Sequence, residues 1–371
     1  MGSKTDTFVI ILAAGYATRL RPLSDRIPKP LIDINGKTLL SRIIFTFKEA
    51  GFNRFCFVIG YKKEFIIKEI LKEKEIETIF IEQKKLTGMG EAIALAFNSI
   101  LKKYRDITAF FITAADIIFS KSELLRMHKL FEHSDIVLSL MKSMDNEVAR
   151  CHGNVKLEKS SNLNKEFDEN QGLRIFDIIE KPKPSQIMSN YYSLPLYLAN
   201  KKILKFMQNI GFSERGEKEF QDALKNAMLY NLNIRGIRIV SPLITADNIG
   251  KFHLTSLRDI IKMNKRFLTG LNLNPYEGKT PTYLEPLTFG NQNLFGNNVT
   301  LGPHVIISNS CSLGDFSQIS NSILYDNVTV GKSCVLDWCI IDEGVTLPDN
   351  LKASDCFFTK ANAKDFEIIN F

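Results

Sequence analysis

The chain has 371 residues, enough for more than one domain, and its 44% hydrophobic and 24% charged residues are ordinary for a globular protein. No stretch approaches the roughly 18 apolar residues that cross a bilayer, and the polar first residues do not form a signal segment. We therefore expect a cytoplasmic protein with no membrane partner. The net charge of +7 comes from dispersed lysines, which gives no support to nucleic-acid binding and equally suits small anionic substrates.

Six cysteines are scattered along the sequence, with no C-x-x-C pair and no histidine at metal-ligand spacing. This distribution argues against a zinc site and against a disulfide framework. We expect buried, reduced thiols at all six positions, which are Cys56, Cys151, Cys311, Cys334, Cys339 and Cys356.

Short apolar runs alternate with helical patterns in the first half of the chain, which predicts an α/β domain with a mixed, mostly parallel sheet. The predicted strands are Phe8–Leu12, Phe55–Ile59, Ile79–Ile81, Ala109–Ile112 and Ile136–Leu140. Helical spacing predicts three buried faces between them: Leu39, Leu40, Ile43, Ile44 and Phe47; Phe65, Ile66, Ile70 and Leu71; and Ala92, Ile93, Ala96, Phe97 and Ile100. The polar segment 143–172 is expected to be an excursion or hairpin over the active-site edge, outside the core.

The most informative motif follows the first predicted strand. Leu12-Ala13-Ala14-Gly15 brings small residues to the point where backbone N–H groups can approach an anion. Arg19 then supplies a planar, permanently charged group for phosphate oxygens, and Lys29 adds a second cation. The spacing matches neither the P-loop nor the dinucleotide fingerprint. It indicates a different nucleoside-triphosphate loop.

This motif, continued by Pro28-Lys29-Pro30-Leu31, resembles the signature of the sugar-nucleotide pyrophosphorylases, such as glucose-1-phosphate thymidylyl- and uridylyltransferases and mannose-1-phosphate guanylyltransferases. The resemblance implies a Rossmann-like nucleotidyltransferase domain that joins a nucleoside triphosphate to a sugar 1-phosphate with Mg²⁺ and releases pyrophosphate. It makes Leu12 to Gly15 nucleotide-binding residues and makes Arg19 and Lys29 catalytic. Ala17 stands at the family's second glycine, where a methyl group is costly if the position needs a positive φ.

Further family motifs follow in order. Gln83 and Gly88 match the residues that read the nucleobase, although Met89 and Gly90 replace the family's Thr and Ala, so the base preference stays open. An amide suits this role because it can both donate and accept at a base edge. Glu180-Lys181-Pro182 matches the family's E-K-P, in which the Glu accepts from sugar hydroxyls and the catalytic Lys meets the sugar 1-phosphate.

Asp116 follows an apolar strand at the position of the family's G-D-N motif. A carboxylate at the end of a parallel strand is suited to hold Mg²⁺ on phosphates. The family's second metal ligand aligns with Asn248, or with Asp247 if the register shifts by one residue. Ala115, the segment Ser193–Tyr197 and Asn248 depart from the family pattern.

From Phe289 onward the sequence becomes a hexapeptide repeat. An apolar residue recurs every sixth position and is followed by Gly or Ser: Phe289, Phe295, Leu301, Ile307, Leu313 and Ile319. This period predicts a short left-handed parallel β-helix of three to four coils, with a slip in register after Ile319. We expect a catalytic domain over 1–250, a helical linker over 251–280 that contains a helix at Leu254–Leu268, and the β-helix over 281–371. Exposed coil edges favour self-association or a cap.

Two other functions stay open. The two-domain layout also resembles the non-catalytic gamma and epsilon subunits of the translation-initiation exchange factor and regulatory paralogues of the pyrophosphorylases. The segment Val58–Glu64 resembles choline-phosphate cytidylyltransferases, which act on another phosphomonoester. An acyltransferase role for the β-helix has less support, since His304 has no partner there that suggests acetyl-CoA chemistry.

Overall fold

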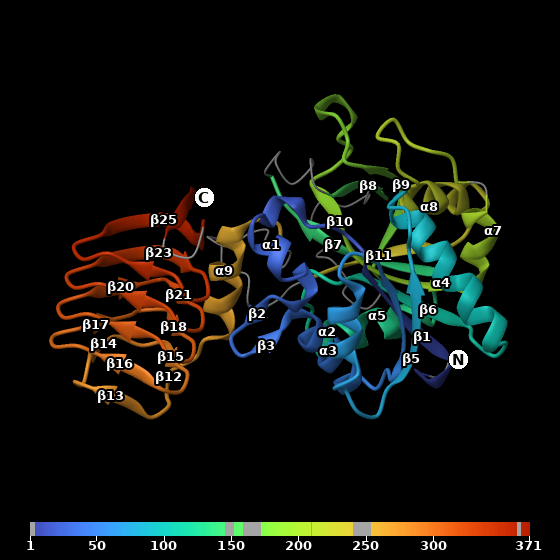
Figure 1. Ribbon diagram of the computed structural model, residues 1–371. Helices are drawn as coiled ribbons and strands as arrows, with labels where there is room; N and C mark the ends of the chain where they lie inside the picture. The colour runs from blue at the N-terminus through green and yellow to red at the C-terminus, as the bar shows by residue number, and fades with distance from the viewer. Residues whose placement is uncertain (1–3, 145–151, 159–171, 209, 240–253, 362–364) are drawn as a thin grey trace. The chain divides into compact units, whose positions relative to one another are not determined.

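The computed structural model describes residues 4–144, 152–158, 172–208, 210–239, 254–361 and 365–371. The chain divides into two compact units (Figure 1). The first comprises Met1–Tyr16, Pro28–Leu31 and Thr38–Phe252, and the second comprises Ala17–Ile27, Ile32–Lys37 and His253–Phe371. Early in its course the chain therefore leaves the first unit twice. Within the described residues, no helix is both long and apolar enough to cross a membrane.

The first unit is built on a nine-stranded mixed sheet with the order β5-β4-β1-β6-β10-β7-β11-β9-β8. Strands β1, β4, β5 and β6 are parallel, β10 is antiparallel to both β6 and β7, and β11 is parallel to β7. The strands are β1 Thr7–Ala13, β4 Arg54–Ile59, β5 Glu77–Glu82, β6 Ala109–Ala114, β7 Ile136–Lys142, β8 Gly153–Leu157, β9 Leu173–Glu180, β10 Tyr191–Asn200 and β11 Ile234–Arg238. All five predicted strands are present, and the α/β prediction is confirmed.

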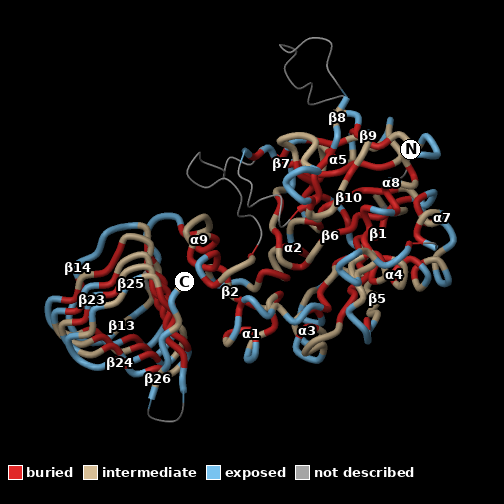
Figure 2. The backbone as a smooth tube through the Cα atoms, turned by 90° about the horizontal axis from the view of Figure 1, so that it is seen from above, coloured by how far each residue is buried: buried red, intermediate tan, exposed pale blue. Residues whose placement is uncertain are grey.

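Helices cover both faces of this sheet. Phe8 and Ile10 of β1 are fully buried in one cluster with residues of α4 (Met89–Lys103), α7 (Leu204–Met207) and α8 (Phe220–Leu229). On the other face, Phe47 of α2 (Leu39–Glu49) packs edge-on against Phe111 of β6 with the ring centroids 5.3 Å apart, and α5 (Lys121–Phe131) lies beside α2. Figure 2 shows buried residues running through the central strands.

One predicted helix face is partly wrong. In α3 (Lys63–Ile70) only Ile66 and Ile70 are buried, whereas Phe65 is 57% exposed and Leu71, just beyond the helix, is 69% exposed. Adjacent residues lie about 100° apart around a helix, so a short helix on the rim of a domain buries a narrow stripe.

The segment 143–172 also contains a core strand that the sequence did not predict. Gly153–Leu157 forms β8, which pairs antiparallel with β9 and with the start of β10, and Val155 is fully buried. The sequence does not mark this strand with an apolar run, because polar residues lie within it and on both sides of it. The rest of the segment, 145–151 and 159–171, lies outside the described residues.

The second unit contains the coil stack of a parallel β-helix. Its strands pair in parallel from coil to coil, and all six inward residues predicted from the repeat, from Phe289 to Ile319, are buried. The strands are β12 Leu271–Leu273, β13 Tyr276–Gly278, β14 Thr282–Tyr283, β15 Leu287–Phe289, β16 Asn293–Phe295, β17 Thr300–Leu301, β18 Val305–Ile307, β19 Ser312–Leu313, β20 Gln318–Ser320, β21 Ile323–Leu324, β22 Thr329–Val330, β23 Val335–Ile341, β24 Thr346–Leu347, β25 Lys352–Lys360 and β26 Phe366–Asn370.

The register slip occurs where the sequence predicts it. Leu301 pairs with Ile319, whereas Ile306 pairs with Ile323, so the step from one coil to the next is shorter on the second face. The corner between Ile319 and Ile323 is therefore one residue shorter than the corresponding corner of the preceding coil. The prediction of three to four coils is too low, because one face alone has five strands, β13-β16-β19-β22-β24. Strands β12 and β13 precede residue 281 and lack the six-residue pattern, and β26 pairs antiparallel with β25 along one edge of the stack.

Helix α9 (Leu257–Phe267) confirms the helix predicted at Leu254–Leu268; it belongs to the second unit and rests on the shortened corner. The guanidinium of Arg258 and the ammonium of Lys265 lie 5.0 Å and 3.8 Å from the ring centroid of Trp338, and Arg258 pairs with Asp355 at 2.9 Å. Trp338 and Asp355 both have a positive φ and occupy equivalent positions in successive coils. The five described cysteines are buried free thiols, as expected, and Cys151 lies outside the described residues.

Candidate active site

The strand order of the first unit creates a switch point beside β1. The chain goes from β1 to β4 and then to β5 on one side, and returns to β6 on the other side of β1. In an open α/β sheet the loops on either side of such a point diverge at the carboxyl ends of the strands and leave a crevice for a ligand. The loops after β1 and β6 are therefore the first place to look for a site.

The loop after β1 is fixed by backbone contacts to its neighbours. Ala115 N–H donates to the Leu12 carbonyl at 3.0 Å, and Tyr61 N–H donates to the Ala14 carbonyl at 3.2 Å. Ala13 and Ala14 are buried. Gly15 is exposed, and a Cβ built on it would meet nothing within 4 Å. The protein itself therefore leaves open the space beside Gly15, which suits the close approach of a ligand to this backbone.

Lys29 and Asp116 meet at the same edge, although they are 87 residues apart in the sequence. Lys29 lies in the short helix η3 (Lys29–Leu31), and Asp116 follows the end of β6. The two side chains form an ion pair and are 16% and 18% exposed. The edge thus offers a fixed cation for phosphate and a carboxylate of the kind that holds Mg²⁺. Asn248 and Asp247, the candidates for a second metal ligand, lie outside the described residues.

Arg19 belongs to the second unit. It is exposed in the short helix η2 (Thr18–Leu20), which begins after Ala17. Ala17 has φ 51° and ψ 45°, the left-handed conformation. For an L-residue with a Cβ this conformation costs roughly 1–2 kcal/mol. The position does need a positive φ, so the departure from glycine carries a backbone cost.

The two predicted base-reading residues lie together. The Gln83 side chain is buried, and its amide donates to the Gly88 carbonyl at 3.3 Å. Gly88 has φ 108°, and a Cβ on it would come within 2.6 Å of the Lys218 carbonyl oxygen. That carbonyl also accepts from Gly90 N–H at 2.8 Å. Both positions therefore need glycine because the backbone at Lys218 passes too close for a Cβ. This requirement is separate from the nucleotide-binding role predicted for Gly88.

A second group of residues meets on the other half of the sheet. Register places Glu180 of β9, Gly153 of β8 and Ser193 of β10 in one row. A Cβ on Gly153 would lie 2.8 Å from Ser193 Oγ and 3.1 Å from Glu180 Oε2. Glycine therefore lets these two polar groups converge. Glu180 also lines a cavity of about 320 Å³, together with Ile178, Ile179, Lys181, Lys183, Gln186, Ser213, Glu214, Arg215, Glu219, Asp222 and Lys225.

Charge in this cavity is closely balanced. Burial raises the pKa of Glu180 to about 7; Lys181 and Arg215 oppose that rise, and Glu219 and Glu217 add to it. Lys181 Nζ lies 3.9 Å from Glu180 Oε1. Arg215 forms an ion pair with Glu219, whose side chain is 7% exposed. The cavity is lined by four cations, Lys181, Lys183, Arg215 and Lys225, and by four carboxyl groups, of which Glu180 has a pKa raised to about 7.

Two buried polar side chains, Tyr197 and Gln221, lie near the row formed by Glu180, Gly153 and Ser193. Burial raises the pKa of Tyr197, so the phenol stays neutral. Gln221 is also buried, and its amide donates to the Tyr197 hydroxyl at 3.3 Å. Tyr197 belongs to the predicted departure Ser193–Tyr197, and the structure keeps this segment within β10.

Sequence reasoning missed Arg215 and Glu219 of this cavity, and Gly153 of the row that ends at Glu180. The only local signal is the run Arg215-Gly216-Glu217-Lys218-Glu219, which by itself looks like a solvated charged turn. Gly153 has no such signal. A larger cavity of about 660 Å³, lined by Lys202, Lys205, Phe206, Asn226, Tyr230 and Leu232, follows the end of β10, where Asn200 pairs with the first residue of β6. It therefore lies at the opposite edge of the sheet.

Both parts of the chain are similar to known proteins. A model of the family described as nucleotidyl transferase matches residues 8–233, and a model of the GlmU-like C-terminal hexapeptide matches residues 296–361. A bifunctional GlmU protein of Methanococcus maripaludis strain C5 is 27% identical over 94% of this chain and 78% of its own length. A GlmU protein of Methanocaldococcus jannaschii is 31% identical, over 62% of this chain and 48% of its own length.

Two further matches concern the first unit mainly. A UTP–glucose-1-phosphate uridylyltransferase of Mycoplasma genitalium is 25% identical over 62% of this chain and 85% of its own length. The crystal structure of a UDP-glucose pyrophosphorylase complexed with UDP-glucose is similar with a TM-score of 0.55 and 20% identity, over 70% of this chain and 98% of that one. This structural likeness supports the fold.

Proposed function

The chain belongs to the nucleotidyl transferase family, and we propose that it transfers a nucleotidyl group from a nucleoside triphosphate to a sugar 1-phosphate. One observation carries the proposal. The Lys29–Asp116 ion pair lies beyond the end of β6, and a separate cavity with Glu180, Lys181 and Arg215 lies at the end of β9 in the same sheet. A reaction between two phosphorylated substrates needs two such places.

The proposed step is an in-line displacement. A phosphate oxygen of the sugar 1-phosphate attacks the α-phosphorus of the triphosphate, the bond from this phosphorus to the bridging oxygen breaks, and pyrophosphate leaves. The nucleophile is already an anion, so no general base is required, and the rate comes from positioning and from stabilising charge. Lys29 and Arg19 would hold the leaving phosphates, and Lys181 and Arg215 would orient the incoming phosphate.

Mg²⁺ suits the carboxylate donor that Asp116 offers. Its preferred ligands are oxygens, and it commonly takes one or two carboxylates and draws the rest from phosphates and water. Asp116, largely buried at the crevice edge, is the described residue that would hold it, with Asn248 or Asp247 as the predicted second ligand. Bound there, Mg²⁺ would neutralise charge on the triphosphate.

On the acceptor side, the Glu180 carboxylate would accept from sugar hydroxyls, and the bare backbone at Gly153 would let the sugar ring approach. The names of two relatives specify UTP and glucose 1-phosphate. These two substrates are the first pair to assay, followed by the other nucleoside triphosphates and other sugar 1-phosphates.

The test is pyrophosphate release by the purified full chain with each triphosphate, Mg²⁺ and each sugar 1-phosphate or phosphocholine. We expect release that needs both a triphosphate and a sugar 1-phosphate and that Lys29→Ala removes. Release with a triphosphate and phosphocholine, but with no sugar 1-phosphate, would favour a cytidylyltransferase. Triphosphate binding without release in any combination would favour a non-catalytic regulatory paralogue. Light scattering on the same sample tests the homo-oligomer that we expect from the exposed coil edges.

A further inference from the structure

The nucleotide motif is divided between the two compact units. Gly15 belongs to the first unit, whereas the next stretch, Ala17–Ile27, belongs to the second unit with the coil stack. Within this stretch Leu20 and Leu23 are each 1% exposed. The stretch that carries Arg19 is therefore an integral part of the β-helix unit.

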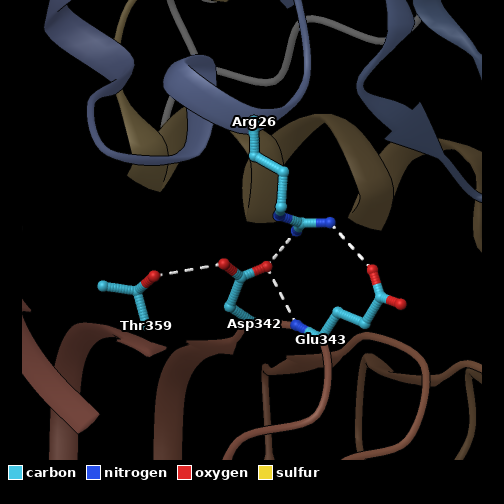
Figure 3. Close-up of polar contacts among 4 residues, drawn as sticks. All are labelled: Arg26, Asp342, Glu343 and Thr359. Carbon is cyan, nitrogen blue, oxygen red and sulfur yellow. Dashed lines mark hydrogen bonds and ion pairs between the residues drawn. The ribbon is translucent and has the colours of Figure 1, made fainter. Parts of the chain in front are cut away.

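Arg26 binds this stretch to the coil stack (Figure 3). It is the last residue of α1 (Leu23–Arg26), and its guanidinium forms ion pairs with Asp342 and with Glu343, the latter at 2.9 Å. Both carboxylates lie in the turn between β23 and β24. Arg26 is far from this turn in the sequence, so the contact is a long-range one.

The coil stack holds Asp342 in place for this contact. Its side chain is 9% exposed. Its Oδ1 accepts from the Glu343 N–H at 2.9 Å, and its Oδ2 accepts from the Thr359 hydroxyl on β25 at 3.2 Å (Figure 3). Because the backbone and a neighbouring coil orient the carboxylate, it offers Arg26 a rigid, largely desolvated partner. A guanidinium is suited to such a planar, directional contact.

The other excursion into the second unit is also bound. In Ile32–Lys37, Asn35 N–H donates to Asn264 Oδ1 at 2.6 Å, and the Asn35 side chain donates to the Phe267 carbonyl at 2.7 Å. Both partners belong to α9. Burial raises the pKa of Tyr325, in the coil stack; the charges of Asp33 and Asp342 add to that rise, and Arg26 opposes it. The two excursions are thus held by the helix and the stack of the same unit.

We propose that Arg26 is a positioning residue through which the β-helix restricts the motion of the stretch 17–27, and with it Arg19. This inference rests on the proposed function in assigning Arg19 to the triphosphate. Arg19 lies in the same stretch, on the turn that precedes α1. A cation must be held in place before reaction if it is to stabilise developing charge without reorganisation. The β-helix then contributes to catalysis without contacting substrate.

The test combines hydrogen exchange with kinetics on the full chain. In Arg26→Ala we expect faster amide exchange in 17–27 and about a tenfold loss of kcat/KM for the triphosphate, because small misplacements of a catalytic group are costly. The KM for the sugar 1-phosphate should change less than twofold. Asp342→Asn should reproduce both effects, and the double variant should be no worse than Arg26→Ala, since both changes break one contact.

Arg258→Ala is the matched control, because it removes another ion pair to the coil stack, with Asp355. It should leave exchange in 17–27 and the kinetics unchanged. Arg26→Lys keeps the charge and guards against a variant that fails to fold; its exchange and kcat/KM should fall between those of the wild type and Arg26→Ala. Unchanged exchange in Arg26→Ala would overturn the proposal, even with activity lost. If the wild type proves inactive, hydrogen exchange still tests whether Arg26 restricts the stretch 17–27. Failure of the proposed function and failure of the positioning role can therefore be told apart.

Discussion

On the nucleotide side of the sheet, one short motif after β1 and one strand end supply Gly15, Lys29 and Asp116, with loops fixed by backbone hydrogen bonds. On the acceptor side, Gly153, Glu180 and Arg215 come from separate segments that meet through strand register and a charged turn. The first side is encoded locally and the second is assembled by the fold. The comparison predicts that variants on each side will affect different substrates.

The largest effect is expected at Asp116. In Asp116→Asn, Lys29 loses its charged partner and the proposed metal site loses its described carboxylate. We expect turnover to fall at least about 10²-fold, the loss typical of removing one preorganised electrostatic group. Pyrophosphate release at saturating substrates measures it. Asp106→Asn, an exposed position at the opposite end of β6, is the control and should stay active. Near-normal turnover in Asp116→Asn would remove the nucleotide-side assignment.

The next effect concerns Arg215, which sequence reasoning missed. Arg215→Ala leaves Glu219 without its cation partner and removes a donor from the acceptor cavity. A charge-assisted hydrogen bond contributes roughly 1.5–3 kcal/mol, so we expect the KM for the sugar 1-phosphate to rise about tenfold or more. The KM for the triphosphate should stay within about twofold. Lys332→Ala, which removes an exposed ion pair with Asp315 in the coil stack, should change neither constant. Equal changes in both constants for Arg215→Ala would contradict the division.

The effect of Glu180 should depend on pH. Because its pKa is raised from 4.5 to about 7, the group is mostly neutral at pH 6 and mostly ionised at pH 8. If the ionised form binds the sugar, kcat/KM for the sugar 1-phosphate should rise about tenfold over this range. Glu180→Gln should lose this rise, while titration of the sugar phosphate itself remains.

Thermal unfolding checks the same group without substrate. A carboxyl with a raised pKa favours folding below its unfolded value and loses that contribution as pH rises through about 7. The melting temperature of the wild type should therefore fall more between pH 6 and pH 8 than that of Glu180→Gln. Parallel curves would place the ionisation elsewhere.

The smallest effect is expected at Ala17. Its left-handed backbone favours glycine, so Ala17→Gly should stabilise the fold by about 1 kcal/mol or less, after the greater flexibility of glycine in the unfolded chain is counted. Urea unfolding measures it. Ala50→Gly is the control: Ala50 has an ordinary φ of −80°, so glycine there should lower the stability of the protein. A loss of stability in Ala17→Gly would mean that the methyl group contributes packing.

The same comparison explains what the sequence could predict. Five of the nine strands of the sheet and the inward residues from Phe289 to Ile319 follow from local periodicity, which one sequence contains, and the Lys29 and Asp116 positions follow from motifs that resemble those of the family. Strand β8, Arg215 and the Arg26 anchor depend on contacts between distant segments, and no local pattern marks them. The predicted number of coils was too low for a related reason. Strands β12 and β13 lack the six-residue pattern, and only their pairing with later strands shows that they belong to the stack.

The most direct test of the two-sided site is a paired kinetic measurement on Lys29→Ala and Lys181→Ala with both substrates varied. We expect Lys29→Ala to impair kcat and the constants for the triphosphate, and Lys181→Ala to raise the KM for the sugar 1-phosphate about tenfold or more with little change for the triphosphate. The same pattern of losses in both variants would contradict a site divided between a nucleotide side and an acceptor side.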